Sequence, residues 1–306
     1  MQTIIPPFLK PGDTIAIAAT ARSVGADQLQ AAVQFMEMKG FKVRMDDGLF
    51  AVENQFAGDE AHRAACFNRL LADPDVKAIW CGRGGYGTAR MVDLIDFDVL
   101  SRHPKWIAGF SDVTVLLNHV YRQCHMASLH STMPVFMHAK TGKDFDDVCL
   151  AADSLAKALS GKFPVFGLQA GPVYNNDGFS GEITGGNLSV LYSVMGSASE
   201  VDWNGKILFL EDLDEYYYHI DRMMLGLRRA GKLSGLKALL VGSFIAMHDH
   251  TVPFGYNVEE IILQHCKAYD YPIVFNVNAG HHLQNIAIPF GVHAEYNQGI
   301  LTFANS

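Results

Sequence analysis

Continuous apolar runs alternate with amphipathic helical patterns along this chain, and no other feature restricts its fold as strongly. The run at 14–19 is typical of a buried strand, and a helical pattern over 27–39 follows it. Further strands are predicted at 42–45 and 76–80, with a helix at 59–71 between them. Uninterrupted apolar strands separated by helices indicate a parallel sheet covered on both faces. The sequence therefore predicts an α/β fold.

The chain has 306 residues, of which 49% are hydrophobic, so it can bury a large core, and its length suggests two domains. A stretch rich in Gly and Pro between Leu159 and Asn176 separates two αβ sets. We predict a Rossmann-like N-terminal domain over 1–155, a linker over 156–177 and a smaller C-terminal α/β domain over 178–306. The elements predicted in the second domain are strands at 206–210, 238–245 and 272–277, and helices at 219–230 and 258–269.

Charge and composition exclude several classes of partner. The 24 basic and 32 acidic residues give a formal net charge of −8, and no basic patch is evident, which argues against nucleic acid and anionic membranes. The first twelve residues lack the pattern of a signal peptide, and no apolar stretch approaches the ~18 residues of a transmembrane helix. Five widely spaced cysteines favour reduced thiols. We therefore expect a soluble, cytoplasmic protein.

One serine lies where a strand is predicted to turn sharply into a helix. An apolar run from Trp106 ends at Gly109-Phe110-Ser111, and a helical stretch over 113–121 follows. Such a turn exposes the serine hydroxyl beside free backbone N–H groups, which suits a nucleophile and the oxyanion that its attack creates. The alternative is an ordinary N-cap, because serine is also favoured at helix starts.

A serine nucleophile needs two partners, and the sequence offers both after apolar runs. The hydroxyl needs an imidazole to take its proton, and the imidazole needs an acid to hold its tautomer. Glu211 comes at the end of one predicted strand and His281 comes soon after another. With 13 histidines in the chain, His281 could instead be an ordinary surface residue, and the acids at 211–215 could form a solvated loop.

Two other motifs offer weaker alternatives. His248-Asp249-His250 contains metal-ligating residue types, but a polar loop explains it equally well, so we expect no metal there. The Gly-rich run at 82–87 matches neither a Walker loop nor a dinucleotide fingerprint. Its flexible backbone can bind an oxyanion or a peptide carboxylate. We therefore expect Arg83, Gly84 and Tyr86 to contact substrate.

Seven short motifs occur in a fixed order along nearly the whole chain, which begins to match at Pro11. They are Cys-Gly-Arg-Gly-Gly-Tyr-Gly-Thr-Ala-Arg at 81–90, Gly-Phe-Ser-Asp-Val-Thr at 109–114, Gly-Gly-Asn-Leu at 185–188, Leu-Phe-Leu-Glu-Asp at 208–212, His-Ile-Asp-Arg-Met at 219–223, Gly-His at 280–281 and Ile-Pro-Phe-Gly at 288–291. In this combination the chain resembles the LD-carboxypeptidase family of serine peptidases. That family comprises muramoyl-tetrapeptide carboxypeptidases of peptidoglycan recycling and microcin self-immunity peptidases.

The resemblance implies an architecture and a catalytic triad. An N-terminal α/β domain would carry the nucleophile, Ser111, and a C-terminal α/β domain would carry the acid, Glu211, and the base, His281. His281 is preferred over His282 because it directly follows Gly280, as the family motif requires. Members of this family are usually cytoplasmic homodimers and need no cofactor.

The resemblance also bears on the groups around the triad. The oxyanion hole would use the backbone N–H of Asp112 and that of Gly85 in the Gly-rich turn. Val113 replaces the second glycine of the Gly-x-Ser-x-Gly elbow, so the chain is not a plain α/β-hydrolase. Arg83 and Arg222 are candidates for binding a terminal carboxylate by charge, and this role stays open.

The implied reaction is hydrolysis of the amide between an L-centre and a terminal D-alanine in murein tetrapeptides. The substrate would be a small peptide. One alternative is a related peptidase that cleaves a non-murein amide, such as that of a peptidyl-nucleotide antibiotic. A more distant alternative is an α/β ligand-binding module that has no catalytic activity.

Overall fold

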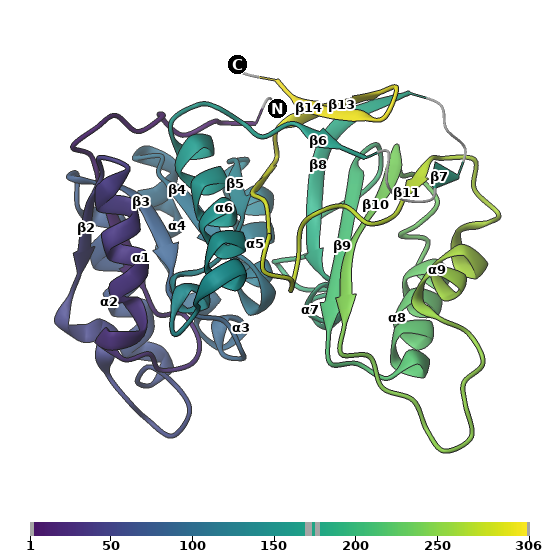
Figure 1. Cartoon of the computed structure of the whole chain (residues 1–306), viewed down its shortest axis with the longest axis horizontal. Coiled ribbons are helices and arrows are strands. Elements are labelled where there is room, and N and C mark those ends of the chain that lie inside the picture. Colours follow the sequence, from purple (N-terminus) through teal and green to yellow (C-terminus); the bar gives the residue numbers. More distant parts are fainter. Residues whose placement is uncertain (1–2, 169–172, 175–177, 305–306) are drawn as a thin grey trace.

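Two β-sheets, one built mainly from each half of the chain, form the framework of this protein. They are seen in a computed structural model that describes residues 3–168, 173–174 and 178–304. Figure 1 shows the sheets side by side, with helices on their faces. This arrangement confirms the predicted α/β class.

The first sheet is parallel except at one edge. Its strand order is β12-β5-β4-β3-β1-β2. Read from β2, the order 2-1-3-4-5 is that of a doubly wound fold, whose ligand crevice lies where the order reverses, at β1 and β3. The strands are β1 (Thr14–Ala18), β2 (Lys42–Met45), β3 (Val76–Cys81), β4 (Trp106–Gly109), β5 (Ser128–His130) and β12 (Ile288–Phe290), the last antiparallel to β5.

Helices cover both faces of this sheet. Figure 1 shows α1 and α6 together on the near face, while α2, α4 and α5 lie on the other. The helix that follows the Gly-rich run, α3, has only four residues, and a 3₁₀ turn over Val92–Leu94 follows it. The helices are α1 (Ala26–Met38), α2 (Glu60–Ala72), α3 (Thr88–Met91), α4 (Phe97–Arg102), α5 (Thr114–Cys124) and α6 (Gly142–Leu159).

The second sheet is mixed, with the order β6-β14-β13-β8-β9-β10-β11-β7. Its four strands from β8 to β11 are parallel, and the outer strands pair antiparallel. The helices α8 and α9 pack on the outer side of this sheet in Figure 1. The elements are β6 (Phe166–Gly167), β7 (Val173–Tyr174), β8 (Phe179–Asn187), α7 (Leu188–Ser193), β9 (Ile207–Leu213), α8 (Tyr217–Arg229), β10 (Ala238–Ile245), α9 (Val258–Cys266), β11 (Ile273–Val274), β13 (His293–Asn297) and β14 (Ile300–Phe303).

The two halves exchange segments at their boundary. Strands β6 and β7, which fall within the predicted linker, pair with strands of the second sheet. Strand β12 comes from the C-terminal half and joins the first sheet beside β5. The rest of that linker, 169–172 and 175–177, lies outside the described residues. The division into a domain ending near 155 and another beginning near 178 therefore stays a prediction.

Helix α5 of the first half lies directly against β8 of the second. Gly185 and Gly186 in β8 have φ angles of +131° and +126°, a region that favours glycine. A β-carbon at Gly186 would lie 2.6 Å from Thr114 Oγ1 on α5. Asn118 Nδ2 donates to the Gly185 carbonyl at 2.8 Å, and the Asn187 N–H donates to Thr114 Oγ1 at 3.1 Å. Gly186 therefore allows a close, hydrogen-bonded contact between the halves, while the side-chain position of Gly185 faces the backbone of β9.

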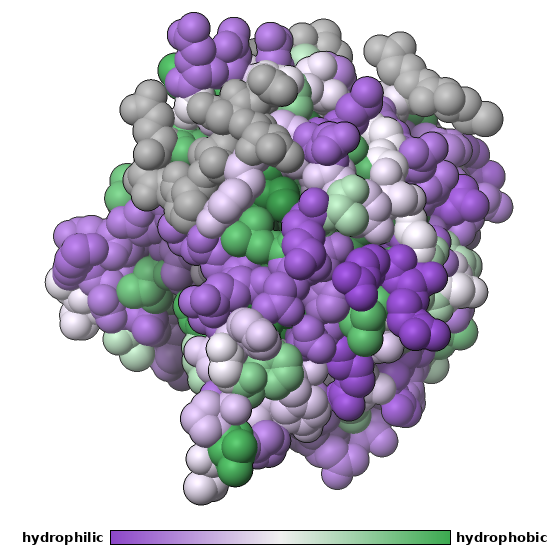
Figure 2. All heavy atoms as spheres, turned by 90° about the vertical axis from the view of Figure 1, so that its right-hand side faces the viewer, coloured by the Kyte–Doolittle hydropathy of each residue, from purple (hydrophilic) through white to green (hydrophobic). Residues whose placement is uncertain are grey.

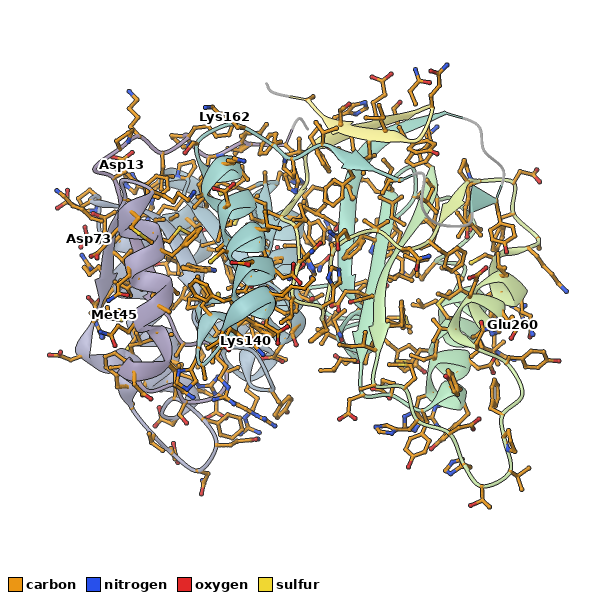
Figure 3. The ribbon with its side chains drawn as sticks, viewed as in Figure 1. Asp13, Met45, Asp73, Lys140, Lys162 and Glu260 are labelled. Atoms are coloured by element: carbon orange, nitrogen blue, oxygen red, sulfur yellow. The ribbon has the colours of Figure 1, made fainter. Side chains whose placement is uncertain are left out.

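Side chains fill the space between the two sheets. Figure 3 shows them meeting between α5 and β8, where the halves join. The outer face of the C-terminal half, seen in Figure 2, is mostly hydrophilic, with hydrophobic residues in small separate groups. Across the described part of the chain, no helix is both long and apolar enough to cross a membrane.

Candidate active site

Ser111 lies at a strained turn between β4 and α5. It begins a 3₁₀ turn over Ser111–Val113, and its φ of +61° is rare for a residue with a side chain. The turn is tight because a β-carbon at Gly109 would lie only 3.0 Å from Val113 Cγ1. The N-cap residues of this turn and of α5 are Phe110 and Val113, so the N-cap interpretation of Ser111 is wrong. The backbone instead presents this hydroxyl at the sheet edge, as in a nucleophile elbow.

The hydroxyl of Ser111 is the first member of a hydrogen-bonded chain that joins the two halves. Ser111 Oγ lies 3.0 Å from His281 Nε2, and His281 Nδ1 lies 2.5 Å from Glu211 Oε2. With a neutral imidazole, the serine O–H donates to Nε2 and the Nδ1–H donates to the carboxylate. Glu211 is completely buried and His281 is 8% exposed. This geometry is that of a nucleophile, a general base and an orienting acid.

Buried carboxylates set the proton affinity of His281. Burial lowers the pKa of the imidazole, but the charge and hydrogen bond of Glu211, with the charge of Asp212, outweigh it and raise the pKa above its ordinary value of 6.5. Burial, followed by the charge of Glu211, raises the pKa of Asp212 to about 7. The site is therefore built to stabilise an imidazolium, the species formed when His281 takes the serine proton.

Two local features hold the acid and the base. Glu211 lies within β9, which continues to Leu213, so the expectation that it follows the end of its strand is wrong. His281 follows Gly280, whose φ is +111° and whose N–H donates to Asn285 Oδ1 at 2.8 Å. A β-carbon at Gly280 would lie 2.8 Å from Glu211 Cβ, so only glycine lets this loop approach the strand so closely.

The Gly-rich turn after β3 lies against the nucleophile. A β-carbon at Gly84 would lie 3.2 Å from Ser111 Cβ and 3.4 Å from Ser111 Oγ. Among the described residues no acceptor takes the N–H of Gly85. The N–H of Asp112 has no partner within its own 3₁₀ turn, because it belongs to the first residues of that turn. Both groups of the predicted oxyanion hole are thus free to donate.

The side chain of Asp112 joins the two loops of the site. Asp112 is buried, and its Oδ2 accepts the N–H of Thr88, the first residue of α3, at 2.8 Å. This carboxylate therefore satisfies the first N–H of α3. This bond ties the end of the Gly-rich turn to the nucleophile turn.

Three other residues were predicted to contact substrate or considered for binding its carboxylate: Arg83, Tyr86 and Arg222. Arg83 Nη1 donates to a backbone carbonyl, that of Ser23, at 3.3 Å. Tyr86 is 49% exposed, on the turn beside Gly84. Arg222 lies on α8, where its guanidinium is 5.4 Å from the Tyr218 ring.

The residues considered for a metal take part in other contacts. His248 Nε2 pairs with Asp214 Oδ1 at 2.6 Å, and the His250 ring stacks on Tyr216 at 4.7 Å between centroids. Within the ranges that the structure describes, no three His, Cys, Asp or Glu side chains form a group that could hold a metal ion.

Sequence reasoning missed one basic residue beside the Gly-rich turn. Arg22 follows β1, and its N–H lies 3.5 Å from the carbonyl oxygen of Gly84. Its side chain lies over Gly85, because a β-carbon there would be 2.6 Å from Arg22 Cδ. The available signal was its place just beyond a predicted strand, beside the strand that leads to the Gly-rich turn.

Comparison with protein-family models gives two matches that together span most of the chain. Residues 15–131 match the model described as the LD-carboxypeptidase N-terminal domain. Residues 180–296 match the LD-carboxypeptidase C-terminal domain. The first match contains Ser111, and the second contains Glu211 and His281.

Individual relatives agree with these models over nearly their full length. A probable murein peptide carboxypeptidase of Bacillus subtilis is 31% identical over 305 residues, covering 95% of this chain and 91% of the relative. The crystal structure of muramoyltetrapeptide carboxypeptidase from Oxalobacter formigenes is 25% identical, with a TM-score of 0.81 and coverage of 95% and 97%. A structure of the microcin C7 self-immunity protein MccF with aspartyl sulfamoyl adenosine shares the fold, with a TM-score of 0.89, 19% identity and 99% coverage of both chains.

Proposed function

Because this chain belongs to the LD-carboxypeptidase family, we propose that it is a serine carboxypeptidase that releases the terminal D-alanine of murein tetrapeptides. The observation that carries this proposal is the chain of hydrogen bonds from Ser111 through His281 to Glu211. These side chains come from both halves of the molecule, and each has the partner that its role requires. Relatives named as murein peptide carboxypeptidases support the choice of substrate.

In the first step Ser111 Oγ attacks the carbonyl carbon of the L-residue while His281 Nε2 takes the hydroxyl proton. The imidazolium that forms stays bonded to the Glu211 carboxylate through Nδ1. The N–H groups of Asp112 and Gly85 stabilise the developing oxyanion. His281 then gives its proton to the nitrogen of D-alanine, which leaves.

In the second step water hydrolyses the acyl-enzyme. His281 takes a proton from that water, which attacks the ester carbonyl and forms a second oxyanion in the same place. Collapse returns the proton to Ser111 and frees the tripeptide with a new L-carboxylate. No residue beyond the triad and the two N–H donors is needed for the proton transfers.

The proposal includes a setting for this reaction. We place the enzyme in the cytoplasm, in peptidoglycan recycling, and expect it to be a homodimer. All five cysteines are free thiols, which supports a reducing compartment. Sedimentation of the purified protein would give a dimer mass if the assembly is as proposed, and a monomer mass at high concentration would overturn that part.

The direct test is incubation of the purified protein with L-Ala-γ-D-Glu-meso-diaminopimelyl-D-Ala, followed by mass spectrometry. We expect wild type to release D-alanine and folded Ser111→Ala to release none above background. A matched control is Ser193→Ala, an exposed serine on α7, which should retain wild-type activity.

The alternative substrate decides what a negative result means. MccF is solved with an acyl sulfamoyl nucleoside. If folded wild type releases no D-alanine from peptides with either diaminopimelate or L-lysine, the murein proposal fails. Cleavage of an aspartyl sulfamoyl adenosine in the same assay would then assign the protein to the self-immunity activity.

A further inference from the structure

We propose that Arg22 binds the terminal carboxylate of the substrate and so restricts the enzyme to removing a C-terminal residue, an inference that rests on the proposed function. An enzyme that releases one terminal amino acid must recognise the free carboxylate next to the scissile bond. The proposed function leaves this recognition without a residue. The positions of Arg22, Gly84, Gly85 and Ser111 supply one.

Sheet topology brings Arg22 to the nucleophile. Arg22 follows β1, the Gly-rich turn follows β3 and Ser111 follows β4, and these three strands are neighbours in the first sheet. Since the strands are parallel, the three segments leave the same edge. The strand order reverses between β1 and β3, which is where doubly wound sheets bind ligands.

Two consecutive glycines then connect the arginine to the serine. At Gly84 the space of a side chain is occupied by Ser111, whose Oγ would be 3.4 Å from a β-carbon there. At Gly85 the same space is occupied by Arg22, with Cδ at 2.6 Å and Nε at 2.7 Å. Because the α-carbons of these consecutive glycines are about 3.8 Å apart, Ser111 and the Arg22 side chain pack against neighbouring residues of the same turn.

That spacing matches the substrate. The carboxylate carbon of a terminal D-alanine lies one residue beyond the scissile carbonyl carbon, a span of at most about 3.6 Å. With the scissile carbonyl at Ser111 and its oxygen at the free N–H of Gly85, the next residue of the peptide passes over the glycine turn toward Arg22. A guanidinium suits this position because its planar fork binds a carboxylate through two parallel hydrogen bonds.

The charge of Arg22 is available for a ligand. Its side chain is exposed, and in the described part of the molecule no carboxylate lies within ion-pair distance of it. Nearby guanidinium groups are already engaged. Arg63 is buried and donates to three backbone carbonyls, Arg90 pairs with Glu60, and Arg83 donates to a backbone carbonyl. The guanidinium of Arg22 therefore differs from those of these arginines, because it has no hydrogen-bond or ion-pair partner among the described residues.

The test compares two peptides that differ only at the C-terminus. One is the murein tetrapeptide with its free carboxylate and the other has a terminal carboxamide. We expect wild type to favour the acid by about 10- to 100-fold in kcat/KM, the range expected for a charge-assisted pair. Arg22→Ala should lower kcat/KM for the acid by that factor, leave the amide unchanged and bring the ratio close to one.

Two further variants separate recognition from a general disturbance. Arg22→Lys keeps the charge but loses the fork, so we expect it to retain part of the preference. Arg90→Ala, an exposed arginine on α3, should keep the full preference. If Arg22→Ala keeps the preference, the assignment is overturned, and its loss in Arg83→Ala would move the role to that residue.

A binding measurement keeps this inference separable from the proposed function. In the Ser111→Ala background, calorimetry should show tighter binding of the acid than of the amide, and Arg22→Ala should abolish the difference. If wild type hydrolyses neither peptide but this carboxylate-dependent binding is present and depends on Arg22, the murein proposal fails and the Arg22 assignment stands. Absence of both hydrolysis and carboxylate-dependent binding overturns both.

Discussion

The N–H of Asn187 in β8 donates to Thr114 Oγ1 in α5 at 3.1 Å, so the helix that follows the nucleophile is bonded to the sheet that carries the acid. Glu211 is the register partner of Asn187 on the neighbouring strand, β9. This helix-on-strand contact is therefore one of those that fix the distance between Ser111 and the His281–Glu211 pair. That contact is possible because residue 186 is glycine, where a β-carbon would lie 2.6 Å from Thr114 Oγ1.

Substitution at this contact should reduce activity without touching the triad. In Gly186→Ala the new β-carbon would lie 2.6 Å from Thr114 Oγ1, at a φ of +126° that alanine rarely adopts. We expect a stability loss of about 1–3 kcal/mol. Because α5 must move away from β8, we also expect kcat to fall by about 10- to 100-fold.

Thermal unfolding and steady-state kinetics of the same preparations would measure both effects. The matched control is Gly167→Ala in β6, where a β-carbon meets nothing within 4 Å. This control should leave stability and kcat close to wild type. Full activity in Gly186→Ala would show that the α5–β8 contact does not set the triad geometry.

The pH dependence of kcat/KM should have an acid limb above pH 6.5. His281 accepts the serine proton only when it is neutral, so activity is lost as pH falls through its pKa. The carboxylates raise that pKa above its ordinary value of 6.5 despite burial. Asp212→Asn removes one of the charges that raise it, and should move the limb to lower pH. An acid limb below pH 6.5 in wild type that Asp212→Asn leaves in place would contradict this electrostatic account.

The carboxylate of Glu211 should matter through its charge more than its shape. Glu211→Gln keeps the volume at a fully buried position but cannot stabilise the imidazolium. We expect kcat to fall by about 10³- to 10⁴-fold while the protein stays folded. The control is Glu215→Gln, which changes a nearby carboxylate that accepts a hydrogen bond from His219 and not from His281. This variant should retain most activity. Equal losses in the two variants would argue against the triad.

Asp112 should contribute through its side chain as well as its N–H. Asp112→Ala removes the acceptor of the Thr88 N–H and leaves that buried donor without a partner, which costs about 1–3 kcal/mol of stability. The Gly-rich turn would then lose its tie to the nucleophile turn, and activity should fall. Asp112→Asn keeps one carbonyl oxygen as an acceptor and should restore most of the stability. Denaturant unfolding and kinetics of both variants test this, and no difference between them would contradict it.

Part of this site could be predicted from the sequence because its signals are local. The run before Ser111 is apolar throughout, and the glycine two residues earlier is needed by the turn itself. Such patterns mark the ends of buried strands, and the doubly wound fold brings those ends together. The close packing of β8 against α5 has no local signal in the sequence. It depends on which α5 side chains fit over the glycines of β8, and those residues are far apart in the chain.

The positions that sequence reasoning missed depend on packing. Arg22 lies in a loop with no motif of its own. Its side chain packs over the Gly-rich turn because Gly85 has no side chain to occupy that space. Strand β12 returns to the first sheet from the other half of the chain, a non-local pairing that apolar runs alone do not specify.

The central claim is that Ser111 is the nucleophile, activated by His281, and covalent labelling tests it most directly. Wild type would be treated with a fluorophosphonate, digested and mapped by mass spectrometry, with His281→Ala treated in parallel. The account predicts one adduct, on Ser111, which forms much more slowly in His281→Ala. An active wild-type preparation that carries no adduct, or carries it on a different serine, would contradict it.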